Sequence, residues 1–194
     1  MSPIILASAS PRRSQLLSGL GVPFTVAPSL ASEPAPARED GANPGAFVEK
    51  LAILKAQSEQ SGPIFLGADT VVVFGGEILG KPRDESEARD MLSRLRGQTH
   101  EVFTGICVRN SEKSLVAHEK TRVTFGQFSD DFIARYVQTG EPMDKAGAYA
   151  AQGRGALLIE KIEGDYFNVV GLPLVALGRL LREFDIAIEE FWAA

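Results

Sequence analysis

Residues 64–74 form a near-continuous apolar run, which predicts a strand in the middle of a sheet with both faces covered. Only the sequence Gly-Ala-Asp-Thr at 67–70 interrupts it. A carboxylate such as Asp69 is costly to bury alone, so we expect it to meet a metal ion, a cation or solvent in a cleft. The alternative is a strand bulge at which Asp69 bonds nearby amides. In a regular strand, the side chains of Asp69 and Thr70 point to opposite faces of the sheet.

Helix and strand patterns alternate along the first part of the chain, and strands follow one another later. Two strand-like runs, Glu101–Val108 and Leu115–Phe125, flank a polar turn and predict an antiparallel hairpin. The sequence therefore predicts an α/β fold with a mixed sheet. Further strands are expected at Ile4–Leu6, Phe24–Ala27 and Ala156–Ile162, and a loop at 28–41. Helices are expected from Pro11 to near Gly19 or Gly21, from Pro44 to near Lys55, from Asp84 to Gly97, from Ser129 through Val137 and from about Leu172 to Phe184.

Capping signals support these helices. Ser10 precedes Pro11, Asn43 precedes Pro44, and Ser129 opens its helix, each in the N-cap position. Asp84 with Glu87 three residues later has the pattern of a capping box.

The strand-to-helix turn at 7–13 collects two serines, free amides and two arginines. Arg12 and Arg13 lie at the positive end of the helix dipole, where cations are unfavourable unless an anion binds nearby. These residues point equally to a phosphate site and to two solvated surface arginines that tolerate the dipole.

Composition limits the function classes. A chain of 194 residues with 44% apolar residues suits one domain, predicted over 1–194, and a net charge of −5 argues against a surface for polymeric nucleic acid. The single Cys107 excludes a disulfide framework and a cysteine metal cluster. No signal peptide or membrane-length apolar run is present, so we expect a cytoplasmic protein that does not bind membranes.

Several polar residues could join one site, although each alone has an ordinary structural explanation. Glu33 with Asp69 could hold Mg²⁺, which prefers oxygen ligands. Gln152 can donate and accept, which suits the edge of a base. No Walker or GxGxxG motif is present, and the two histidines lack zinc or triad spacing. Lysines beside glycines or at element ends could form a phosphate cradle if they converge: Lys55, Lys81 and Lys145.

Five segments, in order, closely resemble the Maf family of nucleoside triphosphate pyrophosphatases: LASASPRRSQLL, GADTVV, GKP, EPMDKAGAYAAQGRGALLIEKIEGDY and VVGLPL. The resemblance extends from about Ile4 to Phe184. It implies an elongated, twisted mixed sheet with flanking helices and two lobes around a central cleft, as in Maf and ITPase-like proteins. Homodimers are common in that family, but no residue here establishes one.

The resemblance also assigns roles to residues. It places the general base on Asp69, with Glu33 and Asp69 as ligands of Mg²⁺ or Mn²⁺. Arg12, Thr70 and Gln152 match the branch similar to dTTP/UTP pyrophosphatases, although Ala150-Ala151 replaces the Gly-Ile that relatives often carry. The implied substrate-binding residues are Ser8, Arg13, Glu33, Lys55, Lys81, Asp144 and Lys145.

The chemistry implied by the resemblance is hydrolysis of dTTP and UTP between the α- and β-phosphates, giving the monophosphate and pyrophosphate. Removal of modified nucleotides and a link to arrest of cell division are further implications. The alternative is a regulator of septum formation that binds nucleotides without cleaving them. A base beside a metal site favours the enzyme, because a binding protein needs neither.

Overall fold

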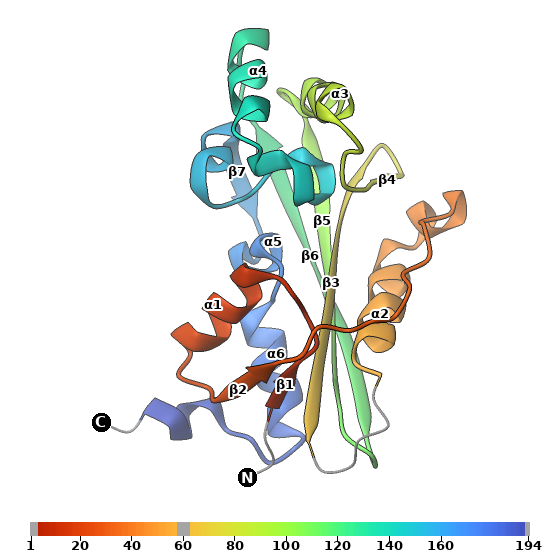
Figure 1. Cartoon of the computed structure of the whole chain (residues 1–194), viewed down its shortest axis with the longest axis vertical. Helices are drawn as coiled ribbons and strands as arrows, with labels where there is room; N and C mark the ends of the chain where they lie inside the picture. Colours follow the sequence, from red (N-terminus) through yellow and green to blue (C-terminus); the bar gives the residue numbers. More distant parts are fainter. Residues whose placement is uncertain (1–3, 58–62, 193–194) are drawn as a thin grey trace.

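The computed structural model describes residues 4–57 and 63–192, and it contains an open, seven-stranded mixed sheet (Figure 1). The strand order is β2-β1-β3-β5-β6-β7, with β4 paired to β3. The β1 strand runs parallel to both neighbours, and the other pairs are antiparallel, including the predicted β5–β6 hairpin. The strands are β1 Ile4–Leu6, β2 Phe24–Val26, β3 Ile64–Phe74, β4 Glu77–Leu79, β5 Thr99–Arg109, β6 Ser114–Phe125 and β7 Ile159–Glu163.

Helices cover both faces of this sheet. The α2 helix packs against β3, β5 and β6, and α5 and α6 pack against β5 and β6 on the opposite side (Figure 1). The prediction of an α/β fold with a mixed sheet is therefore confirmed. The α-helices are α1 Pro11–Gly19, α2 Pro44–Lys55, α3 Glu85–Leu95, α4 Asp130–Gln138, α5 Tyr166–Val170 and α6 Leu174–Arg182. The 3-10 helices are η1 Arg38–Ala42, η2 Glu141–Asp144, η3 Ala146–Ala148, η4 Gly153–Leu158 and η5 Ile188–Trp192.

The two largest hydrophobic clusters lie in an upper and a lower lobe of an elongated molecule, and two smaller clusters lie beneath α2 (Figure 1). The upper core packs α3, α4 and η3 around Phe125, and the lower core packs β1, α1 and α6 around Leu66. The long strands β3, β5 and β6 run through both lobes. Among the described residues, no helix is long and apolar enough to cross a membrane.

The middle of β3 has one free edge. On one side, β3 pairs continuously with β5 from Phe65 to Val73. On the other side, β1 pairs with residues 64–66 and β4 pairs with residues 72–74, so within the described chain residues 67–71 lack a second partner strand. Both faces of β3 can therefore be reached from this gap, which lies between the lobes.

Capping follows the predictions in part. Asn43 and Ser129 accept bonds from the amides of Ala46 and Phe132. The expected capping box at α3 is wrong in one half: Asp84 caps the Glu87 amide, but the Glu87 carboxylate bonds the amide and guanidinium of Arg83 instead. The expected side-chain cap at α1 is also wrong.

At α1, the Ser10 hydroxyl makes no capping bond. The Ser10 amide instead donates to the Ser8 hydroxyl at 3.2 Å. The first turn of α1 is therefore left without a side-chain cap at the end that faces the gap between the lobes.

Several elements and element boundaries differ from the predictions. Residues 153–158 form η4 and not the start of a strand, because the Glu141 carboxylate accepts the Gly155 amide and strand pairing with β6 begins only at Ile159. The last helix begins at Leu174 after Pro173, and a separate short helix, α5, precedes it. The predicted loop 28–41 contains most of η1, and β4 follows the Gly75-Gly76 turn as an additional short strand.

A buried histidine in the upper core predicts acid sensitivity. His100 is 1% exposed, its Nε2 lies 2.8 Å from the Tyr149 hydroxyl, and burial lowers its pKa to about 4. Between about pH 6.5 and pH 4, the unfolded chain binds a proton that the folded chain does not, so stability falls by up to about 3 kcal/mol as the pH falls.

We therefore expect His100→Gln to flatten the fall of unfolding free energy over this pH range, measured by urea titration at several pH values. The slope is compared with that of wild type under the same conditions. Parallel slopes for wild type and His100→Gln would contradict the assignment.

Candidate functional site

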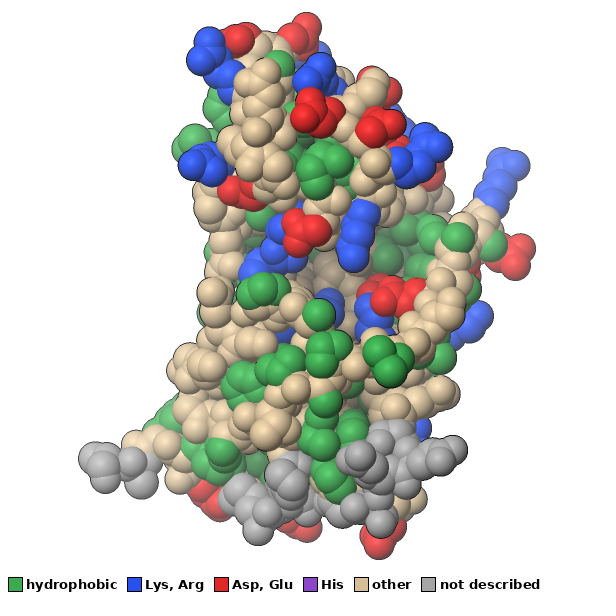
Figure 2. Space-filling model, in the orientation of Figure 1, with side chains coloured by type: hydrophobic (Ala, Val, Ile, Leu, Met, Phe, Trp, Pro, Cys, Tyr) green, Lys and Arg blue, Asp and Glu red, His purple; other side chains and the backbone are tan. Residues whose placement is uncertain are grey.

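A cleft of about 560 Å³ opens between the lobes, along the free edge of β3. Figure 2 shows this hollow in the middle of the molecule, with basic and acidic side chains gathered inside it. Five cationic and three acidic side chains line it, so it carries positive charge within a chain of net charge −5. The charged lining residues are Arg12, Arg13, Glu33, Lys55, Asp69, Lys81, Asp144 and Lys145.

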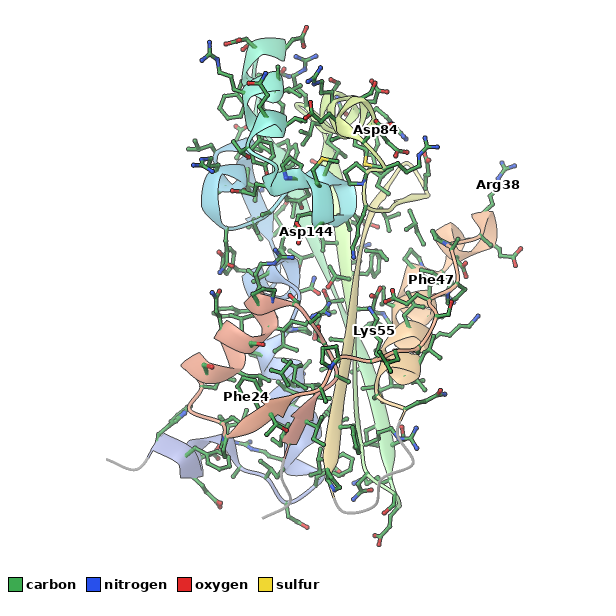
Figure 3. All side chains as sticks on the ribbon, viewed as in Figure 1. Phe24, Arg38, Phe47, Lys55, Asp84 and Asp144 are labelled. Atoms are coloured by element: carbon green, nitrogen blue, oxygen red, sulfur yellow. The ribbon has the colours of Figure 1, made fainter. Side chains whose placement is uncertain are left out.

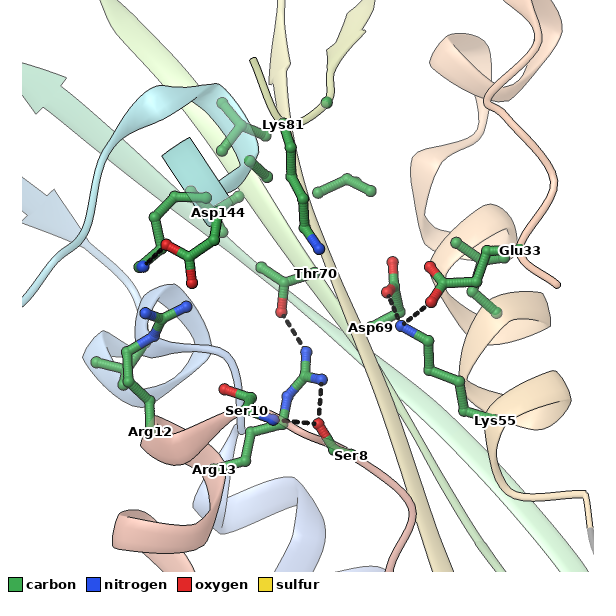
Figure 4. A pocket seen from close by; sticks show the side chains of 18 of the residues that line it. Ser8, Ser10, Arg12, Arg13, Glu33, Lys55, Asp69, Thr70, Lys81 and Asp144 are labelled. Atoms are coloured by element: carbon green, nitrogen blue, oxygen red, sulfur yellow. Dashed lines mark hydrogen bonds and ion pairs between the residues drawn. The ribbon is translucent and has the colours of Figure 1, made fainter. Parts of the chain in front are cut away.

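Arg13 is held rigidly at the floor of the cleft (Figure 4). Its Nε donates to the Gly171 carbonyl at 2.8 Å, Nη1 to the Ser8 hydroxyl at 3.0 Å and Nη2 to the Thr70 hydroxyl at 3.1 Å. Burial lowers the pKa of this guanidinium, which stays charged because its ordinary value lies far above neutrality. A guanidinium fixed by three acceptors is preorganised to bind an anion.

The adjacent Arg12 takes a different direction. It is partly exposed, and its guanidinium points toward Asp144 on the upper side of the cleft (Figure 4). Of the two interpretations of the arginine pair, solvated surface residues are therefore excluded for Arg13 and a cleft position is found for both.

Asp69 is paired with a cation on the other face of β3. Lys55 Nζ at the end of α2 lies 2.5 Å from Asp69 Oδ1 and 3.0 Å from Glu33 Oε1 (Figure 4). The pairing of β3 with β5 is regular through Asp69, opposite Gly105, so the strand-bulge alternative is wrong. Asp69 and Thr70 do lie on opposite faces, as predicted, since Thr70 contacts Arg13 and not α2.

Close packing of α2 on β3 makes this pairing geometrically feasible. A Cβ atom on Gly67 would lie 2.2 Å from the Ala52 carbonyl oxygen and 2.7 Å from the Ala56 amide nitrogen. The absence of a side chain at Gly67 therefore lets the last turns of α2 lie directly over the strand, which places Lys55 within reach of Asp69.

The remaining predicted cations enter from the upper lobe. Lys81 follows β4, and its ammonium group points into the cleft between Thr70 and Asp69 (Figure 4). Lys145 pairs with Asp144, whose pKa is lowered because this bond and the nearby charges outweigh the effect of burial. Asp144 from η2 and Lys55 from α2 thus approach the middle of the molecule from separate lobes (Figure 3).

Gln152 is the predicted site residue that the structure does not place in the cleft wall. Its neighbours Ala150 and Ala151 line the cleft, and Gln152 itself is partly buried beside them. Glu141 anchors the turn that follows: its carboxylate accepts the Gly155 amide at 2.8 Å, the Arg154 amide at 3.2 Å and the Tyr136 hydroxyl at 3.1 Å.

Glu141 was not a predicted site residue. Burial raises the pKa of its carboxyl, but the bonds from Gly155, Arg154 and Tyr136 outweigh burial and hold the pKa below its ordinary value. The sequence signal was an acidic residue just before a glycine-rich segment, at Glu141, and such a residue is usually solvated. The amides that bond its carboxylate, those of Arg154 and Gly155, lie about a dozen positions away in the sequence.

The two carboxylates near Lys55 fit a hard divalent cation. Among described residues, no group of three or more His, Cys, Asp or Glu side chains could hold a metal ion. Asp69 and Glu33 nevertheless converge on one point at the edge of the cleft. Mg²⁺ is commonly bound by one or two carboxylates together with substrate phosphates, so this donor set is sufficient when an anionic ligand supplies the rest.

Comparison with known proteins agrees with this geometry. Residues 3–184 match the family described as Maf-like protein. The chain is 50% identical over 191 residues to the dTTP/UTP pyrophosphatase of Symbiobacterium thermophilum, covering 97% of each chain, and 50% identical over 193 residues to that of Moorella thermoacetica, covering 97% and 98%. A Bacillus cereus protein of the same name is 44% identical over 191 residues, covering 97% and 98%. With matches of this extent, the chain belongs to the Maf family.

Proposed function

We propose that this protein hydrolyses dTTP and UTP to the nucleoside monophosphate and pyrophosphate. The observation that carries the proposal is one cleft that is lined by the Asp69 carboxylate and by five cationic side chains, among which Lys55 contacts Asp69 and Arg13 is fixed by hydrogen bonds. A triphosphate needs cations to neutralise it, and its hydrolysis needs a base to activate water. The names of relatives 44–50% identical support the substrate.

The proposed reaction is a direct attack of water on the α-phosphorus. Asp69 accepts a proton from the attacking water as the new P–O bond forms, and the bond from the α-phosphorus to the bridging oxygen breaks. Pyrophosphate leaves with that bridging oxygen. Arg13 and Lys81 neutralise the phosphate oxygens, and Ser8 and Thr70 hold Arg13 in place.

Asp69 and Glu33 are the residues that we propose to hold a divalent metal, Mg²⁺ or Mn²⁺. When bound, such an ion neutralises phosphate charge and makes a coordinated water more acidic. Lys55 contacts both carboxylates and orients them.

Base selection is assigned to Arg12, Thr70 and Gln152. These three side chains together can bond the carbonyls and the N3–H of a pyrimidine. Support comes from the cleft positions of Arg12 and Thr70 and from the anchored turn beside Gln152. Asp144 lies on the upper side of the cleft, where the Arg12 guanidinium points toward it, and Lys145 pairs with Asp144; we propose that both contact the substrate.

We also propose that the chain works as one domain, because three strands run through both lobes. The ends of the predicted range 1–194 lie outside the described residues. The cytoplasm is the proposed location, since the single cysteine, Cys107, is a buried thiol. The proposed partner is a free nucleotide and no polymeric nucleic acid, because the chain has a net charge of −5 and its cleft has a small excess of cationic over acidic side chains.

The test is release of pyrophosphate and monophosphate from dTTP, UTP, CTP, GTP and 7-methyl-GTP with Mg²⁺ or Mn²⁺. We expect metal-dependent cleavage of dTTP and UTP well above the others. Preference for another base would refute the specificity assignment and leave the chemistry intact. Tight nucleotide binding without cleavage would reject the enzyme.

Glu141→Gln tests the proposed role of the anchored turn. The amide keeps the shape but offers one acceptor oxygen in place of two, so the three donors bonded to Glu141 can no longer all be satisfied. We expect KM for dTTP and UTP to rise about fivefold, with kcat changed less than about twofold. Glu160→Gln, at an exposed position on β7, is the control. Unchanged KM in Glu141→Gln would show that the turn does not contribute to binding.

A further inference from the structure

A continuous line of hydrogen bonds connects Arg13 in the cleft to α5 across the sheet. Arg13 Nη2 donates to Thr70 Oγ1 at 3.1 Å, and Thr70 Oγ1 lies 2.9 Å from Thr104 Oγ1, its cross-strand neighbour on β5. Thr104 Oγ1 donates to the Asn168 carbonyl at 2.8 Å. Thr104 is fully buried and does not line the cleft.

Counting hydrogens settles the direction of every bond in this line. A hydroxyl has one hydrogen, and a carbonyl oxygen can only accept. Thr104 therefore donates its single hydroxyl hydrogen to the Asn168 carbonyl. In the bond between the Thr70 and Thr104 hydroxyls, the donor must then be Thr70. The Thr70 oxygen is then an acceptor toward the cleft, which is what the guanidinium of Arg13 requires. Bonds aligned in one direction polarise and strengthen one another.

The far end of the line is also fixed. Asn168 is fully buried, and its Nδ2 donates to the Val102 carbonyl at 3.0 Å and to the Thr121 hydroxyl at 2.9 Å. The same short helix leads to Gly171, whose carbonyl accepts Arg13 Nε. Gly171 has φ of 116°, and a Cβ there would lie 3.2 Å from Thr70 Oγ1, so α5 ends in close contact with the Arg13–Thr70 pair.

We propose that Thr104 is a positioning residue for phosphate binding: by accepting the Thr70 hydrogen, it makes Thr70 an acceptor that holds Arg13 toward the triphosphate. This inference rests on the proposed function. Without the Thr104 hydroxyl, the Thr70 hydrogen loses its buried acceptor and turns toward the donor hydrogens of Arg13. Arg13 then loses one of its three fixed contacts.

The experiment compares Thr104→Ser with Thr104→Ala, which differ by a single oxygen atom, and adds Thr104→Val as the isosteric variant. The probe is inorganic pyrophosphate, whose binding is measured by calorimetry with Mg²⁺ and does not depend on a base. We expect Thr104→Ser to bind within about twofold of wild type and Thr104→Ala and Thr104→Val about tenfold more weakly. For both variants, kcat/KM for dTTP and for UTP should fall by the same factor.

Cys107→Ala is the control, because Cys107 is an equally buried residue of the same strand whose thiol contacts the Ser114 hydroxyl and no member of the line. We expect its pyrophosphate affinity to stay within about twofold of wild type even if it unfolds at a lower temperature. Equal losses of affinity in Thr104→Ala and Cys107→Ala, or wild-type affinity in Thr104→Ala, would overturn the proposal. Wild-type protein that binds pyrophosphate but does not cleave dTTP would instead reject the proposed function, with the affinities still deciding the role of Thr104.

Discussion

Asp69→Asn is expected to lower kcat for dTTP by about 1000-fold or more, with nucleotide affinity changed only a few fold. A general base contributes about 100- to 10,000-fold, and an amide cannot take a proton from water. The substitution keeps the size of the side chain, and the amide oxygen can still accept a bond from Lys55, which lies 2.5 Å from Asp69 in the wild type. The charge near the metal-binding position is lost, which adds to the effect.

Turnover is measured by pyrophosphate release, and affinity by equilibrium binding of dTTP. Glu33→Gln is the informative comparison, because Glu33 also contacts Lys55 but its side chain is 48% exposed. Its kcat should fall by about tenfold, since water can take over part of its role at an exposed position. A rate near that of wild type for Asp69→Asn would exclude Asp69 as the base, and equal losses in both variants would assign both carboxylates to metal binding alone.

Gly67→Ala is expected to cost about 3 kcal/mol of unfolding free energy and most of the activity. The added methyl would lie 2.2 Å from the Ala52 carbonyl oxygen and 2.7 Å from the Ala56 amide nitrogen, both backbone atoms of or next to α2. Backbone cannot move aside as a flexible side chain can, so the helix must shift away from β3. Since α2 carries Lys55, the contact with Asp69 is broken in the same step.

Thermal and urea unfolding measure the loss, which corresponds to about 10 °C for a chain of this size. The control is Gly19→Ala at the end of α1, where a Cβ meets no atom within 4 Å. Alanine favours helix over glycine, so this control should be neutral or slightly stabilising. A Gly67→Ala protein as stable and active as wild type would show that α2 does not need this close approach.

Local signals predicted most of the elements. The apolar run at 64–74, the hairpin with its polar turn, and the caps at Asn43 and Ser129 each act within a few residues, and the structure agrees at all four places. The error at residues 156–158 arose because a group distant in the sequence makes a bond that no local pattern indicates. Glu141 takes the Gly155 amide, so residues before Ile159 form a 3-10 helix and not a strand.

The sequence by itself determined the fold class, the family resemblance and the residues that could carry chemistry, because hydrophobic periodicity, caps and ordered motifs are properties of short segments. The tertiary structure alone decided which of those residues meet. The gap between β1 and β4 along β3 exposes Asp69 and Thr70 on opposite faces of one strand, and only packing brings Lys55 to the first and Arg13 to the second. Thr104, which meets Thr70 through strand register, carries no local signal, since a threonine in a buried strand is ordinary until its partner across the sheet is known.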